Sequence, residues 1–190
     1  MLIENEFEVA APLDKVWEHL LDVPRIAPCM PGAELTEVVS DNEFKGRVTT
    51  KLGPVSLRFS GTAKIVERDE AARRIVIHAS GSEEKGKGQA SMSVTSTLAP
   101  SGEGTLVKVS QDIQVSGAAA QFGRGMISDV TKVLMGNFAS CIAANIDRES
   151  RGEASAQVAA APAQGFSIGF KAMIMAFKRF FGRLFGAKAA

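Results

Sequence analysis

Residues 117–148, GAAAQFGRGMISDVTKVLMGNFASCIAANIDR, carry the longest helical pattern that precedes the C-terminal tail of the chain. Apolar side chains recur along this stretch at steps of three and four residues, from Phe122 to Ile146, and this spacing is typical of a helix with one buried face. Such a helix would span on the order of 40 Å, long enough to lie across the whole sheet of a small domain. We therefore predict that the preceding chain forms a curved sheet around this helix.

The composition is that of a globular protein. The chain has 190 residues, of which 45% are hydrophobic and 23% are charged, and its formal net charge is +1, which is typical of a soluble domain with a sizeable core. Residues 1–148 carry a net charge of −3, whereas residues 164–190 carry five cations and no acid. Nucleic acid is not expected as a partner, because it would need a basic face on the folded domain. The acidic, alternating N-terminus also lacks the features of a secretory signal.

The two cysteines, Cys29 and Cys141, lie far apart in the sequence and match no zinc or redox spacing. We expect both to be reduced thiols in the core of a cytosolic protein, with a disulfide between them as the less favoured alternative. No metal site is expected.

The chain before the long helix reads as strands with one short helical interruption. Residues 2–9 alternate apolar and acidic side chains, as a half-buried strand does. Pro12 opens a short helix, and residues 22–32 continue as a helical turn or two that ends in a proline-fixed loop. From residue 33 to residue 117, turn residues separate roughly six strands, which predicts an antiparallel meander.

Several residues on the predicted inward face of the sheet are small, among them Gly61, Ala63, Ala79 and Ala90. A sheet that curves around one helix needs bulk to fill its concave face, because protein interiors are close-packed. The size pattern therefore leaves two alternatives open, a ligand cavity and a sheet that lies closer to the helix.

Three stretches resemble the CoxG family of carbon monoxide dehydrogenase accessory proteins: FEVAAPLDKVWEHLLDVPRIAPCMPGAE at 7–34, KLGPV at 51–55 and FGRG at 122–125. These proteins belong to the START-like helix-grip superfamily, with polyketide cyclases and lipid-transfer proteins. The resemblance covers roughly residues 1–148 and implies an α+β fold, in which a curved antiparallel sheet of about seven strands surrounds a long C-terminal helix and encloses an apolar tunnel.

The resemblance also implies a setting for the protein. CoxG proteins are accessory to molybdenum-hydroxylase carbon monoxide dehydrogenases. They are cytoplasmic, they are tied to membrane attachment and to the respiratory chain, and they stand outside the catalytic enzyme. This implies a partner enzyme of that class and a peripheral location on the inner face of the cell membrane.

Catalytic side chains are not evident in the sequence. The chain has no tyrosine, and its two histidines, His19 and His78, have no acidic partner nearby in sequence that would make an acid–base pair. The Gly123-Arg124-Gly125 triplet lacks the strand and the spacing of a phosphate-binding loop. We expect instead that its glycines let the start of the helix pass close to the sheet, with Arg124 exposed or paired with a carboxylate. The protein is not expected to be an enzyme.

The C-terminal part is predicted to be a flexible linker, residues 149–165, followed by an amphipathic helix, residues 166–186. Four cations within about twenty residues exclude a spanning helix, so we expect this helix to lie in the interface of an anionic membrane. Packing against this domain or against a partner protein is the alternative. The residues expected to bind the membrane are Phe170, Lys171, Ile174, Phe177, Lys178, Arg179, Phe181, Arg183 and Leu184.

Taken together, an apolar tunnel and a membrane-surface helix suggest a carrier of a lipophilic small molecule. The ligand expected from the oxidoreductase setting is a non-covalently bound isoprenoid quinone, menaquinone or ubiquinone. The alternatives are an adaptor that recruits the enzyme to the membrane without carrying a ligand, and a small cyclase or hydrolase. The residues predicted to line the ligand site are Met30, Val48, Phe59, Ala63, Met92, Val94, Val109, Phe122, Met126 and Val130.

Overall fold

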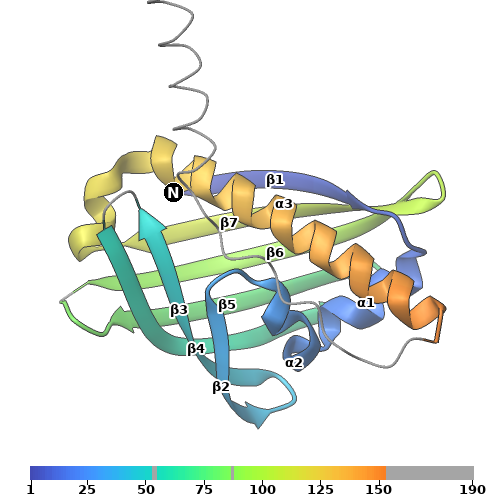
Figure 1. Cartoon of the computed structure of the whole chain (residues 1–190), viewed down its shortest axis with the longest axis horizontal. Helices are drawn as coiled ribbons and strands as arrows, with labels where there is room; N and C mark the ends of the chain where they lie inside the picture. The colour runs from blue at the N-terminus through green and yellow to red at the C-terminus, as the bar shows by residue number, and fades with distance from the viewer. Residues whose placement is uncertain (53–54, 87, 153–190) are drawn as a thin grey trace, which may run out of the picture.

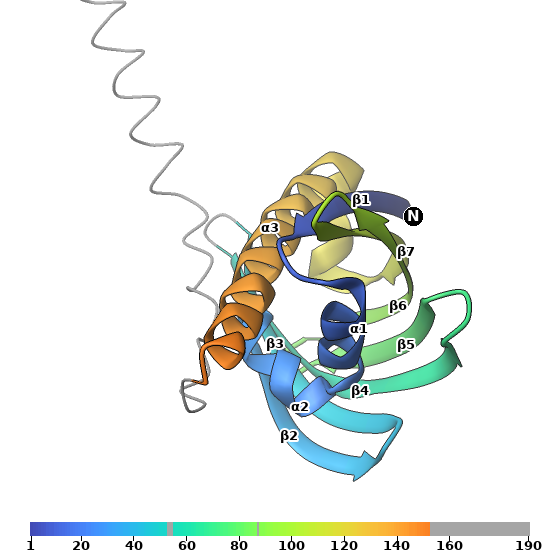
Figure 2. The ribbon, with the colours of Figure 1, turned by 90° about the vertical axis from the view of Figure 1, so that its right-hand side faces the viewer.

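The computed structural model describes residues 1–52, 55–86 and 88–152 of the chain. A seven-stranded antiparallel sheet curves around one long helix, α3 (Gly123–Ser150), as Figures 1 and 2 show. This arrangement confirms the predicted α+β helix-grip fold. The predicted tail helix, residues 166–186, and the linker from residue 153 onward lie outside the described residues.

The strands follow one another as hairpins, except that β1 pairs with β7, so that the order across the sheet is β1-β7-β6-β5-β4-β3-β2. Strands β1 and β2 are therefore the two edges. The helical segments α1 (Leu13–Leu21), α2 (Val23–Ile26) and η1 (Ala27–Cys29) connect these edges, and η2 (Gly117–Phe122) precedes α3. The strands are β1 (Leu2–Val9), β2 (Ala33–Ser40), β3 (Glu43–Leu52), β4 (Val55–Asp69), β5 (Arg74–Glu83), β6 (Gln89–Ser101) and β7 (Gly104–Val115).

The main core lies at the α1 end of the sheet. Val9 of β1, Val16 of α1 and Ile142 of α3 are fully buried there, and the rings of Phe7 and Phe138 meet edge to face at 6.2 Å. Figure 2 shows α1 and α2 at this end of the concave face. The second half of α3 is thus held by the core, while a smaller cluster around Leu57 lies near η2 and the first half of α3.

The long helix begins later than its sequence pattern predicts. Residues 117–122 form the 3-10 segment η2, and α3 starts at Gly123, whose φ of 68° is a left-handed conformation that favours glycine. A Cβ atom on Gly125 would meet nothing within 4 Å, so the expectation that both glycines allow close approach to the sheet is wrong. The helix also continues through Glu149 and Ser150, which the composition of the sequence had suggested to be linker.

The expectation of two reduced thiols is also wrong. Cys29 and Cys141 form a disulfide that joins η1 to the middle of α3, with their Cα atoms 5.4 Å apart. Their separation of 112 residues gave no sign of this, because the fold alone brings η1 against α3. Both cysteines are buried.

A row of small residues crosses the sheet on its inner face. Gly46, Gly61, Gly81 and Ala90 are paired directly across β3, β4, β5 and β6, and directly paired residues share a face of the sheet. A Cβ atom on Gly61 would overlap the backbone oxygen of Ser80. The absence of a side chain there therefore permits the close approach of two strands, and it also leaves the inner face bare.

Candidate ligand-binding cleft

The inner face of the sheet can be identified from one contact and the strand register. Gln111 of β7 touches Met135 of α3 through its side chain, so its face of the sheet is the one that α3 covers. Val94 pairs with Gln111, and one alternation along the strands Met92 pairs with Ala79 and Ala79 with Ala63. These side chains therefore all lie on the concave face beneath the helix.

Part of this concave face stays open to solvent. Met92 keeps 37% of its surface exposed and Val48 keeps 46%, although register places both on the inner face. On the facing side of α3, Met126 is 44% exposed and Val133 is 55% exposed. The first half of α3 thus leaves an apolar cleft open between itself and the sheet, rather than the closed tunnel that the resemblance implied.

Two apolar clusters close the ends of this cleft. Near η2, Phe59, Phe122 and Val130 pack on the small cluster around Leu57. At the α1 end, Met30 and Val94 pack on the main core. Between them, the glycine row lies next to the row of Ala63 and Met92, so the floor of the cleft is largely backbone and small side chains.

The predicted ligand-site residues divide accordingly. Register and packing bring nine of them to the cleft or its end walls, namely Met30, Val48, Phe59, Ala63, Met92, Val94, Phe122, Met126 and Val130. Val109 faces the same side but is buried inside the main core, so it supports the cleft from below. The predicted membrane-binding residues lie outside the described residues.

Sequence reasoning missed three polar side chains on the same face. Asn5 and Gln111 lie beneath α3, and Glu83 pairs with Phe59 at the η2 end. Asn5 alternates in phase with Ile3 and Phe7, so the strand pattern already placed it inward. Its polarity drew no attention because the neighbouring glutamates face the other way.

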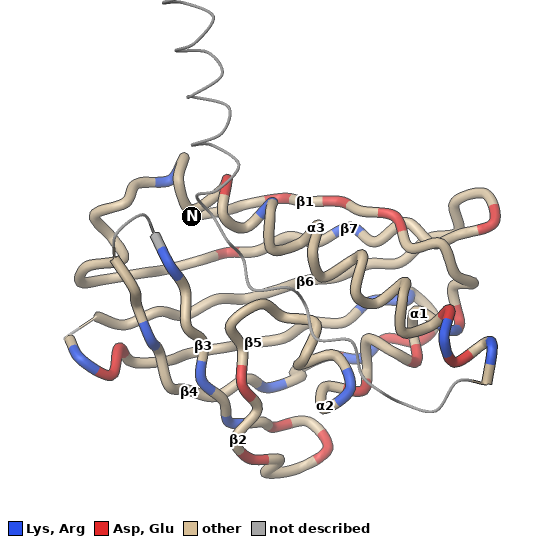
Figure 3. The backbone as a smooth tube through the Cα atoms, viewed as in Figure 1, with Lys and Arg blue, Asp and Glu red and all other residues tan. Residues whose placement is uncertain are grey.

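Charge is sparse around the cleft. Figure 3 shows an uncharged stretch of α3 between Lys132 and Asp147, whereas acidic residues follow one another along β1. Among the described residues, no three His, Cys, Asp or Glu side chains come together as a metal site would require. The described helices also include none that is long and apolar enough to cross a bilayer.

A second depression, of about 580 Å³, lies over β4 to β7 near the glycine row. Most of its lining comes from hydroxyl and amide side chains that alternate with the inward residues and so face away from α3. Ser60, Ser80, Ser91 and Gln114 are typical members. Such a polar, open surface is unsuited to an apolar ligand, so the cleft beneath α3 is the candidate site.

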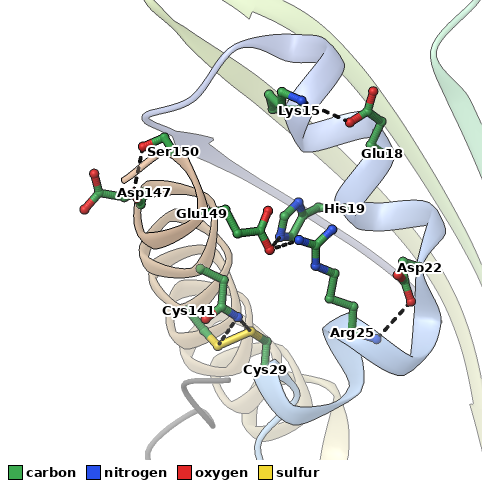
Figure 4. A network of polar contacts seen from close by, with 11 residues as sticks. Lys15, Glu18, His19, Asp22, Arg25, Cys29, Cys141, Asp147, Glu149 and Ser150 are labelled. Atoms are coloured by element: carbon green, nitrogen blue, oxygen red, sulfur yellow. Dashed lines mark hydrogen bonds and ion pairs between the residues drawn. A yellow bond between two sulfur atoms is a disulfide. The ribbon is translucent and has the colours of Figure 1, made fainter. Parts of the chain in front are cut away.

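His19 has an acidic neighbour that the sequence did not reveal. Its Nε2 lies 3.5 Å from a carboxylate oxygen of Glu149, without the geometry of a hydrogen bond, and Arg25 forms an ion pair with the same carboxylate (Figure 4). Burial, and then the charge of Arg25, hold the pKa of His19 below its usual range. With only 2% of its surface exposed, His19 helps to hold the end of α3 on α1 and α2, and it is not open to a substrate.

The disulfide adjoins this network. The side-chain amide of Asn145 lies 3.3 Å from the sulfur of Cys29 and 3.8 Å from that of Cys141, and Figure 4 shows the bridge on the side of α3 that faces η1. The ion pair and the disulfide together fix the second half of α3, whereas the first half is held by η2 and by Arg124, which donates to the carbonyl oxygen of Leu2 at 3.0 Å.

Comparison with known proteins agrees with this architecture. The family model described as a carbon monoxide dehydrogenase subunit (CoxG) matches residues 6–147, which confirms the resemblance seen in the sequence. No curated protein matches the chain.

Solved structures share the fold at low sequence identity. A conserved protein from Geobacillus kaustophilus is 18% identical, with a TM-score of 0.70 over 78% of this chain and 97% of the other. The Zhui aromatase/cyclase from Streptomyces sp. R1128 is 19% identical, with a TM-score of 0.56 over 82% and 98% of the two chains. A START superfamily protein from Mycobacterium smegmatis is 15% identical, with a TM-score of 0.51 over 78% and 98%.

Proposed function

The chain belongs to the CoxG family of carbon monoxide dehydrogenase, and from this we propose that it is a carrier of a lipophilic molecule between a membrane and its partner enzyme. The observation that carries the proposal is the open apolar cleft. Met92, Met126 and Val133 expose apolar surface that faces a concave floor, and an exposed apolar patch in a soluble protein marks an interaction site. A lipophilic ligand would cover that surface.

The proposed ligand is an isoprenoid quinone, menaquinone or ubiquinone, bound without a covalent bond. The family name associates the chain with carbon monoxide dehydrogenase, and an oxidoreductase needs an electron acceptor. The apolar lining of the cleft suits a long isoprenoid chain. The proposed partner is accordingly a carbon monoxide dehydrogenase or a related molybdenum hydroxylase.

We place the protein at the inner face of the cell membrane, attached through the tail. The tail supplies six of the eleven phenylalanines of the chain and five cations, which together favour an anionic membrane surface. Disulfides are uncommon in the cytoplasm. The Cys29–Cys141 bridge is buried, however, and thiol exchange requires access to the sulfur, so burial would protect it there.

A catalytic role is the less favoured alternative. One of the solved structures with this fold is named as a cyclase, but a likeness at 19% identity extends to the fold alone. In this chain His19 is buried against Glu149 and lies away from the open part of the cleft. The remaining alternative is an adaptor that recruits the enzyme to the membrane and carries no ligand.

Extraction separates the carrier from the adaptor. The full-length protein, purified from a host that makes quinones, is extracted with organic solvent and the extract is analysed by mass spectrometry. A carrier yields a near-stoichiometric isoprenoid lipid, which an Ala63→Trp variant with a filled floor does not. An extract without any lipid, together with intact binding to the enzyme, would favour the adaptor.

A further inference from the structure

Two side-chain amides lie on the inner face of the sheet beneath the first half of α3. Asn5 of β1 is paired with Val109, and Gln111 stands two positions further along β7. The two residues are diagonal neighbours on one face, a relation that places their Cα atoms about 7–8 Å apart. One small ring can therefore reach both amides.

Neither amide is well satisfied within the protein. The Nδ2 atom of Asn5 is buried and has no hydrogen-bond partner among the described residues. Gln111 is only 6% exposed, and its Nε2 donates to the thioether sulfur of Met135 at 3.8 Å, a weak acceptor. A buried donor without a good acceptor destabilises a protein, so natural structures rarely keep one without a reason.

The amides are continuous with the cleft. Gln111 pairs with Val94, and the next inward residue on β6 is Met92, which lies on the open part of the floor. Above them, Thr131 of α3 is buried and donates its hydroxyl to the backbone oxygen of Ile127. A polar group at the inner end and an apolar path to the mouth suit a molecule with a polar head and a long apolar chain.

The immediate surroundings of the amides are neutral. Register places Ile3, Val94, Ser96 and Val109 around them on the inner face. A carboxylate head group buried here would meet amide dipoles but no compensating charge from these neighbours, and burying an unpaired charge is far more costly than burying a neutral acceptor. The site therefore selects against fatty acids.

We propose that Asn5 and Gln111 form the head-group subsite of the cleft, and that this subsite takes a neutral ring that carries carbonyl groups. Each amide has a donating NH2 group and an accepting oxygen. The same pair can therefore donate to the carbonyl of a quinone and accept from the hydroxyl of the corresponding hydroquinone, so that both redox forms are held. This inference rests on the proposed carrier function, because it specifies the ligand of the same cleft.

The test compares three probes of similar chain length on the full-length protein: decylubiquinone, decylbenzene, which lacks carbonyls, and dodecanoate. Native protein should bind decylubiquinone about tenfold more tightly than either of the others, as one or two hydrogen bonds to otherwise unpaired donors would give. The double variant Asn5→Leu/Gln111→Leu should bind decylubiquinone and decylbenzene equally. Gln114→Leu, an outward-facing change on the same strand, is the matched control and should keep the preference.

The possible results separate the subsite from the carrier. Equal binding of decylubiquinone and decylbenzene by the native protein overturns the subsite and leaves the apolar cleft intact. A preference that survives in the double variant also overturns it. Native protein that binds none of the probes refutes the carrier function and the subsite together.

Two further measurements guard against a purely structural role. Asn5→Leu removes an unpaired donor, so the variant without ligand should melt at or above the temperature of the native protein, and a loss of several degrees would mark Asn5 as structural and overturn its assignment. If the double variant does not fold, infrared spectra of decylubiquinone bound to the native protein decide. A carbonyl stretch lowered relative to detergent supports the subsite, and an unshifted band overturns it.

Discussion

Replacing the two exposed apolar residues of α3 that face the cleft should separate ligand affinity from stability. Met126 and Val133 keep 44% and 55% of their surfaces exposed, so Met126→Ser/Val133→Ser removes little that the folded protein buries. We expect the free energy of unfolding to change by less than about 1 kcal/mol, as for other surface substitutions. Urea unfolding measures this quantity.

The same double substitution should weaken ligand binding much more. Full burial of such a side chain is worth about 1.5–3 kcal/mol, and a bound ligand would cover roughly the exposed half of each. The pair should therefore contribute about 2 kcal/mol to binding, which corresponds to a rise of about 30-fold in Kd. Decylubiquinone is the probe, titrated against the full-length protein.

A matched control makes this comparison decisive. Val66, which is 45% exposed, and Val39, which is 44% exposed, carry similar apolar surface on β4 and β2, outside the set of residues that line the cleft. Val39→Ser/Val66→Ser should leave the Kd unchanged. An unchanged Kd in the α3 variant, or an equal loss in both variants, would refute a ligand site beneath α3.

Three further predictions concern the fastening of α3 and the tail. Replacing Cys29 and Cys141 by Ser opens a loop of 112 residues and should lower the free energy of unfolding by about 5 kcal/mol in the chain-entropy model; urea unfolding of the double variant would contradict this by matching the oxidised protein. Because burial and Arg25 lower the pKa of His19, the unfolded chain takes up this proton at a higher pH than the folded protein, so stability should fall as the pH drops below about 6.5. His19→Gln should flatten that slope between pH 7 and pH 5, and an unaltered slope would exclude His19 as its source. A chain that ends at Ala163 should stay folded and still bind decylubiquinone, but it should no longer sediment with anionic liposomes; unchanged sedimentation would assign the tail to a protein contact.

The sequence predicted the sheet and the long helix because both have regular periodicity. Residues 2–9 alternate at a period of two, and Phe138, Ile142 and Ile146 recur at helical spacing, so burial of one face followed directly. The start of the helix was misplaced, since residues 117–122 have the composition of a helix but form η2 before the left-handed turn at Gly123.

Contacts between distant segments were beyond the reach of periodicity. The approach of Cys29 to Cys141 and of His19 to Glu149 depends on where η1 and the end of α3 meet in the fold. The openness of the cleft depends on how far the first half of α3 lies from the sheet, which no local pattern encodes. The lining residues were nevertheless placed on the correct face, because alternation alone decides the face.

The covalent tie at Cys141 turns α3 into a lever with an unequal grip on its two arms. The shorter arm, from Cys141 to Ser150, is clamped by the core and by the ion pair of Glu149 with Arg25. The longer arm, from Gly123 to Cys141, measures about 27 Å and contains Gly136, which weakens a helix locally. Any swing of α3 must pivot near Cys141, and a tilt of about 10° would move its far tip by about 5 Å. The mouth can therefore widen for a passing chain while the fulcrum and the core beneath it stay in place.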